Sequence, residues 1–285
     1  MRILITGAVG QLGTAMVREF ARGHTVVQLT IEDLDLTRHA DVMARVADER
    51  PDAIINCAAY TDVDGAEDHP VETLEVNAFA VRTLAAAARE GGAVLVHFST
   101  DFVFDGKGDT PYTEEDRPEP QSYYAISKLV GEWFARDAGS HFVLRVESLF
   151  GGVTGDAPAK RSSVDKIIDA IAGGREARVF VDRTVTPSYI VDVAAATRFL
   201  LEDGAPAGLY HCVNSGACTW FELAQQVARV LQVEAHLIAV PVDQVKLRAA
   251  RPKYCALSNA KLAAEGFVMP RWQDALSRYL ASTRV

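Results

Sequence analysis

Short apolar runs alternate with longer amphipathic segments through the first half of the chain. The apolar runs are rich in aliphatic and β-branched residues, as in strands buried on both faces of a sheet, and they cover Arg2–Thr6, Thr25–Leu29, Ala53–Cys57, Ala93–Phe98 and Phe142–Val146. The segments between them have helical periodicity and cover Gln11–Arg22, Arg38–Arg50 (with Thr37 as candidate N-cap) and Pro70–Glu90. This alternation predicts an α/β fold of the Rossmann type, with a doubly wound parallel sheet and right-handed crossovers.

The pattern is less regular after Gly151. The stretch Gly151–Ser163 is rich in glycine, proline and small residues and predicts a loop. Beyond it we expect helices at Val164–Ala172, Pro187–Glu202, Thr219–Leu231 (opened by a capping box with Glu222) and Arg271–Ala281, strands at Arg178–Val181 and Leu209–Val213, and a short helix capped by Ser258. We therefore predict a dinucleotide-binding domain over residues 1–150, joined by roughly residues 182–208, and a smaller C-terminal α/β substrate lobe over residues 151–181 and 209–285.

The charge of the chain bears on its partners. Lysine and arginine number 29 against 38 aspartate and glutamate residues, so the formal net charge is −9. An acidic chain without a Lys/Arg-rich run is not expected to bind nucleic acid, and any phosphate site must be built locally. No stretch approaches 18 uninterrupted apolar residues, so we expect no membrane span.

The four cysteines, at positions 57, 212, 218 and 255, form no C-x-x-C pair. Cys57 lies in an apolar run and is expected to be a reduced, buried thiol. This cysteine usage, with an N-terminal apolar run too short for a signal peptide, favours a cytoplasmic protein. The histidines and acids show no metal-ligand spacing, so no metal site is predicted.

Three glycines follow the first predicted strand directly. They are Gly7, Gly10 and Gly13, and with Gln11 and Leu12 they open the first predicted helix. Glycine permits a tight turn and a close approach of the backbone to a pyrophosphate, and the helix N-terminus offers free N–H groups to it. The strand–turn–helix context predicts a dinucleotide site, and a glycine-rich turn without a ligand is the alternative.

The end of the second predicted strand should carry a group that binds the adenosine ribose. Thr30 and Ile31 stand there, followed only by the acids Glu32 and Asp33, and no arginine is present to pair with a 2′-phosphate. The cofactor is therefore expected to be NADPH or NADH, with the preference open.

A tyrosine and a lysine lie one helical turn apart further along the chain. Tyr124 and Lys128 share one helix face, and an ammonium beside a phenol is expected to lower the phenol's pKa. Such a pair can exchange a proton with a carbonyl oxygen while hydride moves at the carbon. Taken alone, a tyrosine and a lysine at this spacing more often lie on an exposed helix face. The catalytic interpretation therefore depends on the position of the pair after the predicted dinucleotide site.

A third polar group is expected where the fourth predicted strand ends, because open α/β sheets bind ligands at their carboxyl edge. Ser99 and Thr100 stand there, and either hydroxyl could hydrogen-bond the substrate oxygen. The alternative is that the hydroxyl only caps the end of the strand.

These three features together resemble the extended short-chain dehydrogenases/reductases. Further stretches are similar to the dTDP-4-dehydrorhamnose reductase family, in order and over essentially the whole chain. These stretches are Arg50–Thr61, Ser99–Gly106, Gly208–Asn214 and Arg251–Tyr254. The resemblance implies NAD(P)H-dependent reduction of the 4-keto group of a nucleotide-linked deoxysugar. In that family the reaction converts dTDP-4-dehydrorhamnose to dTDP-L-rhamnose.

The resemblance also implies residue roles. Thr100, Tyr124 and Lys128 would be catalytic, with Tyr124 as the proton donor and Lys128 holding the nicotinamide ribose. Asp101 would lie beside the substrate. The cofactor would be bordered by Gly7, Gly10, Gln11, Leu12, Gly13, Asp35, Leu36, Ala58, Ala59, Tyr60, Tyr124 and Lys128.

Several positions depart from the family. Ser148 stands where a tryptophan commonly faces the sugar, Glu147 adds a carboxylate beside it, and Phe102 replaces a usual tyrosine. These changes leave the reaction class intact and the exact sugar open. Arg251 is a candidate for pairing with the substrate diphosphate, with a solvated arginine as the alternative. His97, His211 and Trp220 are expected to be core residues.

Two other functions fit the same features. One is a nucleotide-sugar epimerase or dehydratase, in which hydride leaves and returns within one cycle. The other is a catalytically silent NAD(P)-binding regulatory subunit, against which the intact Thr100, Tyr124 and Lys128 argue. A nucleotide sugar is the expected partner of a reductase and of an epimerase or dehydratase. Whether the chain forms a homodimer is left open.

Overall fold

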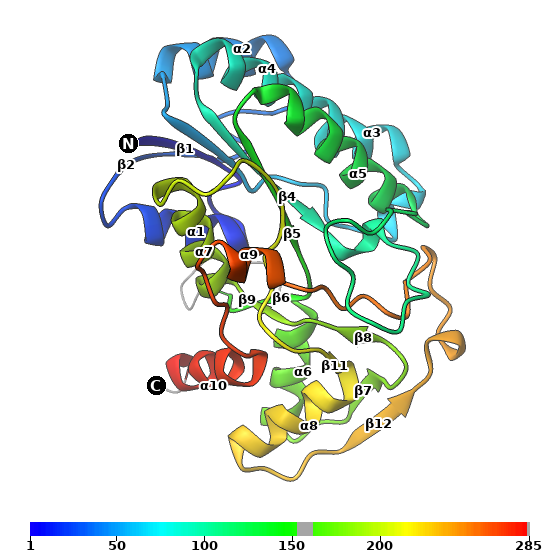
Figure 1. Cartoon of the computed structure of the whole chain (residues 1–285). Helices are drawn as coiled ribbons and strands as arrows, with labels where there is room; N and C mark the ends of the chain where they lie inside the picture. The colour runs from blue at the N-terminus through cyan, green and yellow to red at the C-terminus, as the bar shows by residue number, and fades with distance from the viewer. Residues whose placement is uncertain (153–161, 284–285) are drawn as a thin grey trace.

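The structure is a computed structural model that describes residues 1–152 and 162–283. Its main element is a six-stranded parallel sheet in the order β10-β5-β4-β3-β1-β2 (Figure 1). The strands are β1 (Arg2–Thr6), β2 (Thr25–Leu29), β3 (Ala53–Asn56), β4 (Val94–Thr100), β5 (His141–Val146) and β10 (Gly208–His211). The predicted doubly wound parallel α/β fold is confirmed, because aliphatic runs buried on both faces leave no solvated side for an antiparallel sheet.

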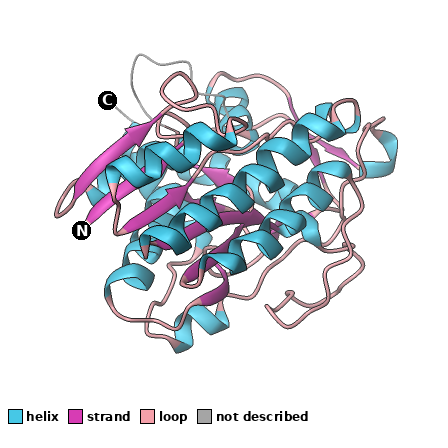
Figure 2. Cartoon of the chain, turned by 90° about the horizontal axis from the view of Figure 1, so that it is seen from above, coloured by secondary structure: helices cyan, strands magenta, loops and turns pink. Residues whose placement is uncertain are grey.

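Helices cover both faces of this sheet. Helices α2 (His39–Glu49), α4 (Ala80–Gly91) and α5 (Tyr123–Ala135) lie on one face, and α1 (Gln11–Phe20) packs with α7 (Ile190–Glu202) on the other. In Figure 2 the first layer lies in front of the strands. Two separate groups of buried side chains fill the two interfaces, as a sheet between helix layers requires.

Two helices differ from the prediction, one in its N-cap and the other in its interior. The N-cap of α2 is Arg38 and not Thr37, because the amide and hydroxyl of Thr37 both donate to Asp35 Oδ1, at 3.0 and 2.8 Å. The long predicted helix at Pro70–Glu90 consists of α3 (Pro70–Leu74), a π-helical turn η2 (Glu75–Phe79) and α4. A π turn inserts one extra residue and is frequent at functional sites.

A smaller lobe lies below the sheet in Figure 1. It is built from β7 (Ala177–Phe180) paired with β12 (Leu237–Val240), β8 (Thr184–Val185) with β11 (Cys218–Thr219), and β6 (Leu149–Phe150) with β9 (Ser188–Tyr189). Its helices are α6 (Ser163–Ala172), α8 (Trp220–Leu231) and α10 (Trp272–Thr283), whereas the short helix α9 (Ala260–Ala264) contacts β10 of the large sheet. Along the chain, single 3-10 turns lie at η1 (Gly65–Glu67), η3 (Asp101–Val103), η4 (Arg136–Ala138) and η5 (Val242–Gln244). None of the described helices is both long and apolar enough to cross a membrane.

The capping box that opens α8 is confirmed, since the Thr219 hydroxyl accepts from the Glu222 amide and the Glu222 carboxylate accepts from the Thr219 amide. The N-cap position of the short helix α9 is Asn259, whose side chain makes no capping hydrogen bond, while the Ser258 hydroxyl accepts from the Ala260 amide at 3.4 Å. The predicted loop at 151–163 falls largely outside the described residues, and Ser163 already belongs to α6.

One strand predicted for the substrate lobe belongs to the large sheet instead. The strand predicted at Leu209–Val213 and assigned to the substrate lobe is β10, the edge strand of the large sheet. It pairs in parallel with β5, with Tyr210 opposite Leu144. The side chain of Tyr210 is fully buried, so the strand is held by packing as well as by its backbone. The remaining domain boundaries stay a prediction.

Helix α5 approaches the π turn closely at Gly131. A Cβ added there would lie 2.3 Å from the carbonyl oxygen of Asn77 and 3.1 Å from Nε2 of His97. Backbone cannot give way as a flexible side chain can, so only glycine lets α5 settle against η2 at this distance.

We therefore expect Gly131→Ala to destabilise the protein. Overpacking of this kind costs about 1–3 kcal/mol, and it should lower the urea midpoint of unfolding. The matched control is Gly91→Ala at the end of α4, where an added Cβ meets nothing within 4 Å. That change should be neutral or slightly stabilising, because alanine favours helix over glycine by up to about 1 kcal/mol. Equal midpoints for the two variants would contradict the packing argument.

Candidate active site

The strand order reverses between β1 and β3, the point where open α/β sheets bind ligands. The glycine turn follows β1 at this point. Gly7 has φ +63°, and a Cβ on it would lie 2.7 Å from the amide nitrogen of Ala58. A Cβ on Gly13 would lie 2.1 Å from the carbonyl oxygen of Gly7. These two glycines therefore allow β1, α1 and the loop after β3 to meet, while Gly10 stays exposed on the outer side of the turn.

The N-terminus of α1 suits a pyrophosphate. Its N-cap is Gly10, which makes no side-chain cap, and the first turn, with Gln11, Leu12 and Gly13, contains no acidic residue. The free N–H groups and the positive end of the helix are thus available to an anion without a competing carboxylate. The residues present fit a dinucleotide, which would be held here by the predicted glycine turn.

The loop after β3 is fixed by one amide side chain that the sequence analysis missed. Asn77, in the π turn, accepts from the Tyr60 amide at 2.9 Å and donates to the Tyr60 carbonyl at 3.0 Å. It also donates to Ser127 Oγ at 3.0 Å, on α5 between Tyr124 and Lys128. Asn77 thus connects the predicted cofactor loop Ala58–Tyr60 to the helix of the predicted proton donor.

The predicted adenine-side residues lie near the end of β2. The carboxylate of Asp35 accepts hydrogen bonds from the backbone and side chain of Thr37, which lower the pKa of Asp35. Leu36 is buried in the same core cluster as Val42 and Val46. Asp33 Oδ2 accepts from the amide and the hydroxyl of Thr30 at 2.9 and 2.8 Å. The turn after β2 therefore presents carboxylates at its surface.

Strand alternation separates the two hydroxyls at the end of β4. Ser99 donates to Glu132 Oε1 at 2.6 Å, on the inner side of α5. Thr100 points to the other face, where its hydroxyl donates to Asp101 Oδ1 at 2.9 Å and accepts from the Phe102 amide at 3.2 Å. Thr100 thus caps η3, as the alternative interpretation held, and also stands beside the predicted proton donor.

The phenol of Tyr124 lies beside this group, hydrogen-bonded with Thr100, and the residue as a whole is partly buried. Its ring meets Phe102 edge to face, with ring centroids 5.9 Å apart. Burial raises the pKa of Tyr124 to about 12, the charge of Asp101 acts in the same direction, and a hydrogen bond with Thr100 opposes them. The phenol is therefore protonated at neutral pH and is suited to give a proton away.

Lys128 is buried and donates from Nζ to the Phe98 carbonyl at 2.6 Å. Burial lowers its pKa to about 8, opposed by the charges of Glu132 and Cys57. The expectation that this ammonium lowers the pKa of Tyr124 is wrong in direction. Burial of the phenol dominates, and the lysine is directed at the end of β4.

A buried ion pair anchors α5 to the sheet. Glu132 accepts two hydrogen bonds from Arg145 of β5, each 2.8 Å long, and both side chains are almost completely buried. Arg145 also lies 4.9 Å from the centre of the Phe104 ring and 3.3 Å from His211 Nε2. The sequence analysis named neither member of this pair. The arginine precedes the unusual Val146-Glu147-Ser148 stretch by one residue.

The fold brings together three groups that are distant in sequence. Asp101, Glu147 and Cys255 are buried, and one carboxylate oxygen or sulfur atom of each lies within 4.8 Å of the others. Sequence spacing could not reveal this set, because its members follow β4, β5 and η5. Arg183 stands beside it, 3.8 Å from Cys255 Sγ, and its guanidinium lies 5.9 Å from the Phe102 ring centre.

Arg251 reaches the same aromatic ring from the smaller lobe. Its guanidinium carbon lies 5.8 Å from the centre of the Phe102 ring, and Nη2 pairs with Asp64 at 3.0 Å. The predicted substrate residue is therefore next to the site, already held by a carboxylate. Its pairing with a diphosphate stays a prediction.

The residues expected to be structural lie in the core. His97 and His211 are buried, and burial lowers the pKa of both. Trp220 packs in the main hydrophobic cluster. All four cysteines are free, with Cys57 partly buried and the other three buried.

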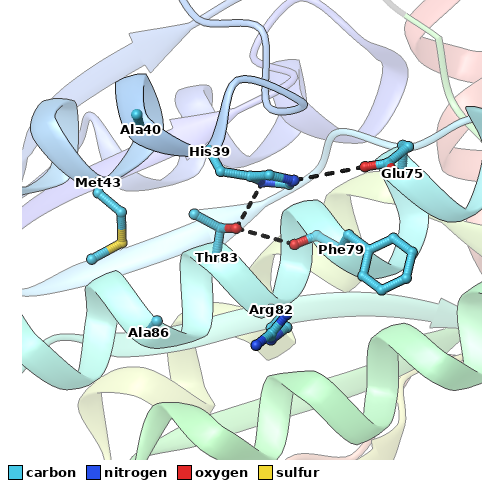
Figure 3. A pocket seen from close by; sticks show the side chains of 8 residues that line it. All are labelled: His39, Ala40, Met43, Glu75, Phe79, Arg82, Thr83 and Ala86. Atoms are coloured by element: carbon cyan, nitrogen blue, oxygen red, sulfur yellow. Dashed lines mark hydrogen bonds and ion pairs between the residues drawn. The ribbon is translucent and has the colours of Figure 1, made fainter.

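A surface pocket of about 550 Å³ lies away from these groups, between α2 and α4. Figure 3 shows His39 and Thr83 bonded across it, at 2.8 Å, with Phe79 and Arg82 at its rim. It contains none of the predicted site residues, and its His39 side chain also lies 3.6 Å from the Glu75 carboxylate.

Comparison with known proteins agrees with this geometry. The sequence profile described as RmlD substrate binding domain matches residues 1–285. A dTDP-4-dehydrorhamnose reductase of Streptomyces griseus is 34% identical over 97% of this chain and 92% of its own length. A probable dTDP-4,6-dihydroxy-2-methyloxan-3-one 4-ketoreductase of Streptomyces antibioticus is 36% identical over 97% and 93%. The crystal structure of dTDP-4-dehydrorhamnose reductase from Bacillus anthracis in complex with NADP has a TM-score of 0.92, with 32% identity and 99% of both chains covered.

The match of the profile to the full chain, the dinucleotide-type turn after β1 and the Tyr124/Lys128 pair on α5 lead to one conclusion: this chain belongs to the RmlD substrate-binding-domain family of extended short-chain dehydrogenases/reductases.

Proposed function

We propose that this protein reduces the 4-keto group of a dTDP-linked deoxysugar with NADPH or NADH, with dTDP-4-dehydrorhamnose as substrate and dTDP-L-rhamnose as product. The observation that carries the proposal is Tyr124, protonated at neutral pH, beside Thr100 at the carboxyl edge of the sheet. The full-length similarity to reductases named for this substrate supports the sugar.

The mechanism uses residues at two strand ends and on one helix. The glycine turn would hold a reduced nicotinamide dinucleotide, which when bound would supply hydride to the carbonyl carbon. Tyr124 donates its proton to the carbonyl oxygen, and Thr100 hydrogen-bonds the same oxygen and stabilises the charge that develops on it. Lys128 would hold the nicotinamide ribose, and Gly10, Gln11 and Leu12 would bind the pyrophosphate.

The sugar pocket differs from that of the usual family pattern at two positions. Ser148 removes an aromatic surface, and its φ of +45° is strained for a serine. Phe102 lacks the hydroxyl of a tyrosine but packs against Tyr124 and under Arg183 and Arg251. A related 4-keto sugar, such as the one named for the Streptomyces antibioticus relative, is the second candidate substrate.

The epimerase alternative requires no net reductant, whereas the reductase consumes one NAD(P)H for each carbonyl. The raised pKa of Tyr124 favours the reductase. A phenol that stays protonated is a donor in the reducing direction and a poor base for removing an alcohol proton. We also place the protein in the cytoplasm, in keeping with its four free cysteines.

Tyr124→Phe should abolish most activity. Loss of a general acid typically costs about 10²–10⁴-fold in rate, so kcat for NAD(P)H oxidation with dTDP-4-dehydrorhamnose should fall in that range while dinucleotide binding persists. Tyr123→Phe is the matched control, since Tyr123 is 46% exposed on the next helix position. Full turnover by Tyr124→Phe would remove the proposed mechanism.

We expect NADH to be used at least as well as NADPH. The turn after β2 carries Glu32 and Asp33, and the nearby cations Arg45 and Arg38 already act on Asp33 and Asp35, so a 2′-phosphate there would meet like charge. The kcat/KM ratio of NADH to NADPH measures this. Asp33→Asn keeps an oxygen for Thr30 and removes the charge, so it should move the ratio several-fold toward NADPH; a ratio strongly in favour of NADPH in the unchanged protein would contradict the argument.

The partner left open by the sequence is a second copy of the chain, and we propose that two copies meet along α5. Tyr123, Ile126 and Trp133 are 46%, 40% and 55% exposed and share one helix face. An apolar stripe on one helix can pair with itself about a two-fold axis.

Trp133→Glu should therefore halve the mass measured by light scattering at micromolar concentration. Val268→Glu is the control, because Val268 is 76% exposed on another part of the surface and should leave the mass unchanged. A monomeric unchanged protein would rule out the interface.

A further inference from the structure

Two carboxyl groups lie side by side at the ends of neighbouring strands. The register pairs Thr100 of β4 with Val146 of β5, so the next residues, Asp101 and Glu147, leave the sheet at the same level. They are 3% and 2% exposed. With Cys255, their polar atoms lie within 4.8 Å of one another, a spacing that one water or a small rotation of a side chain bridges.

The hydrogen bonds of the two carboxyls are unequal. Asp101 Oδ1 accepts from Thr100. Glu147 Oε2 accepts from the amide and the hydroxyl of Thr186, but Oε1 is buried without a hydrogen-bond partner among the described residues. Burying an ionised carboxylate while one of its oxygens lacks a hydrogen bond destabilises the fold. A proton on Oε1 turns that oxygen into a donor, and the carboxyl of Asp101 is a neighbouring acceptor.

The charges around Glu147 point the same way. The titratable groups that act on it or respond to it are Asp101, Arg183, Cys218, Tyr254 and Cys255. Arg183 is the one cation among them and offsets one carboxylate only. Burial raises the pKa of Asp101 to about 6, and burial together with the charge of Asp101 raises the pKa of Glu147 well above its usual range. Two adjacent buried carboxyls do not both ionise at neutral pH.

We propose that Asp101 and Glu147 share one proton at neutral pH and that this proton reloads Tyr124 through Thr100 after each carbonyl reduction. Glu147 is then a positioning residue that holds the proton, while Tyr124 delivers it. The proposal rests on the reductase function proposed above, because only net reduction consumes a proton in every cycle.

While the carbonyl carbon accepts hydride from the reduced dinucleotide, the O–H bond of Tyr124 breaks and its proton bonds to the carbonyl oxygen. The phenolate takes the proton of the Thr100 hydroxyl, Glu147 passes the shared proton to Asp101, and Asp101 passes it on to the Thr100 oxygen, so both carboxylates are briefly ionised. Water returns one proton to the carboxyl pair when the alcohol product leaves.

Infrared spectroscopy of the protein without substrate tests the shared proton directly. At pH 7 the unchanged protein should show the carbonyl stretch of a protonated carboxylic acid, and Glu147→Gln should remove it. Glu114→Gln is the matched control, because burial also raises the pKa of Glu114, whose carboxylate accepts from the His211 amide at 2.7 Å. No such band in the unchanged protein, or its loss in Glu114→Gln, would overturn the proposal. This result does not depend on which substrate the enzyme takes.

Rapid-mixing kinetics with dTDP-4-dehydrorhamnose test the reloading step. In Glu147→Gln the first turnover should keep its rate, since Tyr124 begins protonated, while steady-state kcat falls roughly tenfold with KM unchanged. The alkaline limb of kcat should move to lower pH, because Asp101 beside a neutral amide releases its proton earlier. Glu147→Asp retains an acid and should recover part of kcat.

Two other outcomes would overturn the relay. One is an equal fall of the first-turnover and steady-state rates in Glu147→Gln, which would indicate a structural role. The other is stoichiometric zinc in the purified protein that is lost in Glu147→Gln, because metal ligation requires both carboxylates ionised.

Discussion

The fully buried pair of Glu132 and Arg145 holds the catalytic helix against the sheet. Taking two charges out of water is favourable only when their hydrogen bonds are well made, and here Arg145 binds both carboxylate oxygens while Ser99 donates a third hydrogen bond. Ser99 and Arg145 face each other in the register of β4 and β5. The pair therefore ties α5 to both central strands at one level. Tyr124 and Lys128, on the same helix, take their places relative to Thr100 from this attachment.

Thr100 and Ser99 illustrate how the strands divide structural from chemical work. Consecutive residues of β4 point to opposite faces. Ser99 joins the buried network beneath α5, and Thr100 faces the cleft with Asp101. In β5, Arg145 belongs to the network, whereas Glu147 lies beyond the end of the strand at Val146 and stands beside Asp101. The chemistry of the site thus follows from strand register.

Features set by local sequence could be predicted, and features set by register could not. The strands, the glycine turn and the Tyr124/Lys128 spacing are each contained within a few residues, so periodicity and spacing reveal them. Asn77 contacts Tyr60 and Ser127 across 17 and 50 positions, and the grouping of Asp101, Glu147 and Cys255 arises only when the sheet forms. Thr37 has the residue type of an N-cap, but its amide and hydroxyl donate to Asp35 Oδ1 in the preceding turn, and the N-cap position is Arg38. The run containing β10 was identified as a strand, yet its sheet was not, because hydrophobicity does not state a partner.

The π turn at Asn77 has a consequence for motion. The side-chain amide of Asn77 makes two hydrogen bonds with the backbone of Tyr60 and one with Ser127. These bonds join the loop after β3 to the helix α5. A displacement of that loop by an arriving dinucleotide would travel to the phenol-bearing helix through side-chain hydrogen bonds, without deforming the strands between. Occupancy on one side of the cleft and proton-donor alignment on the other are in this way mechanically linked.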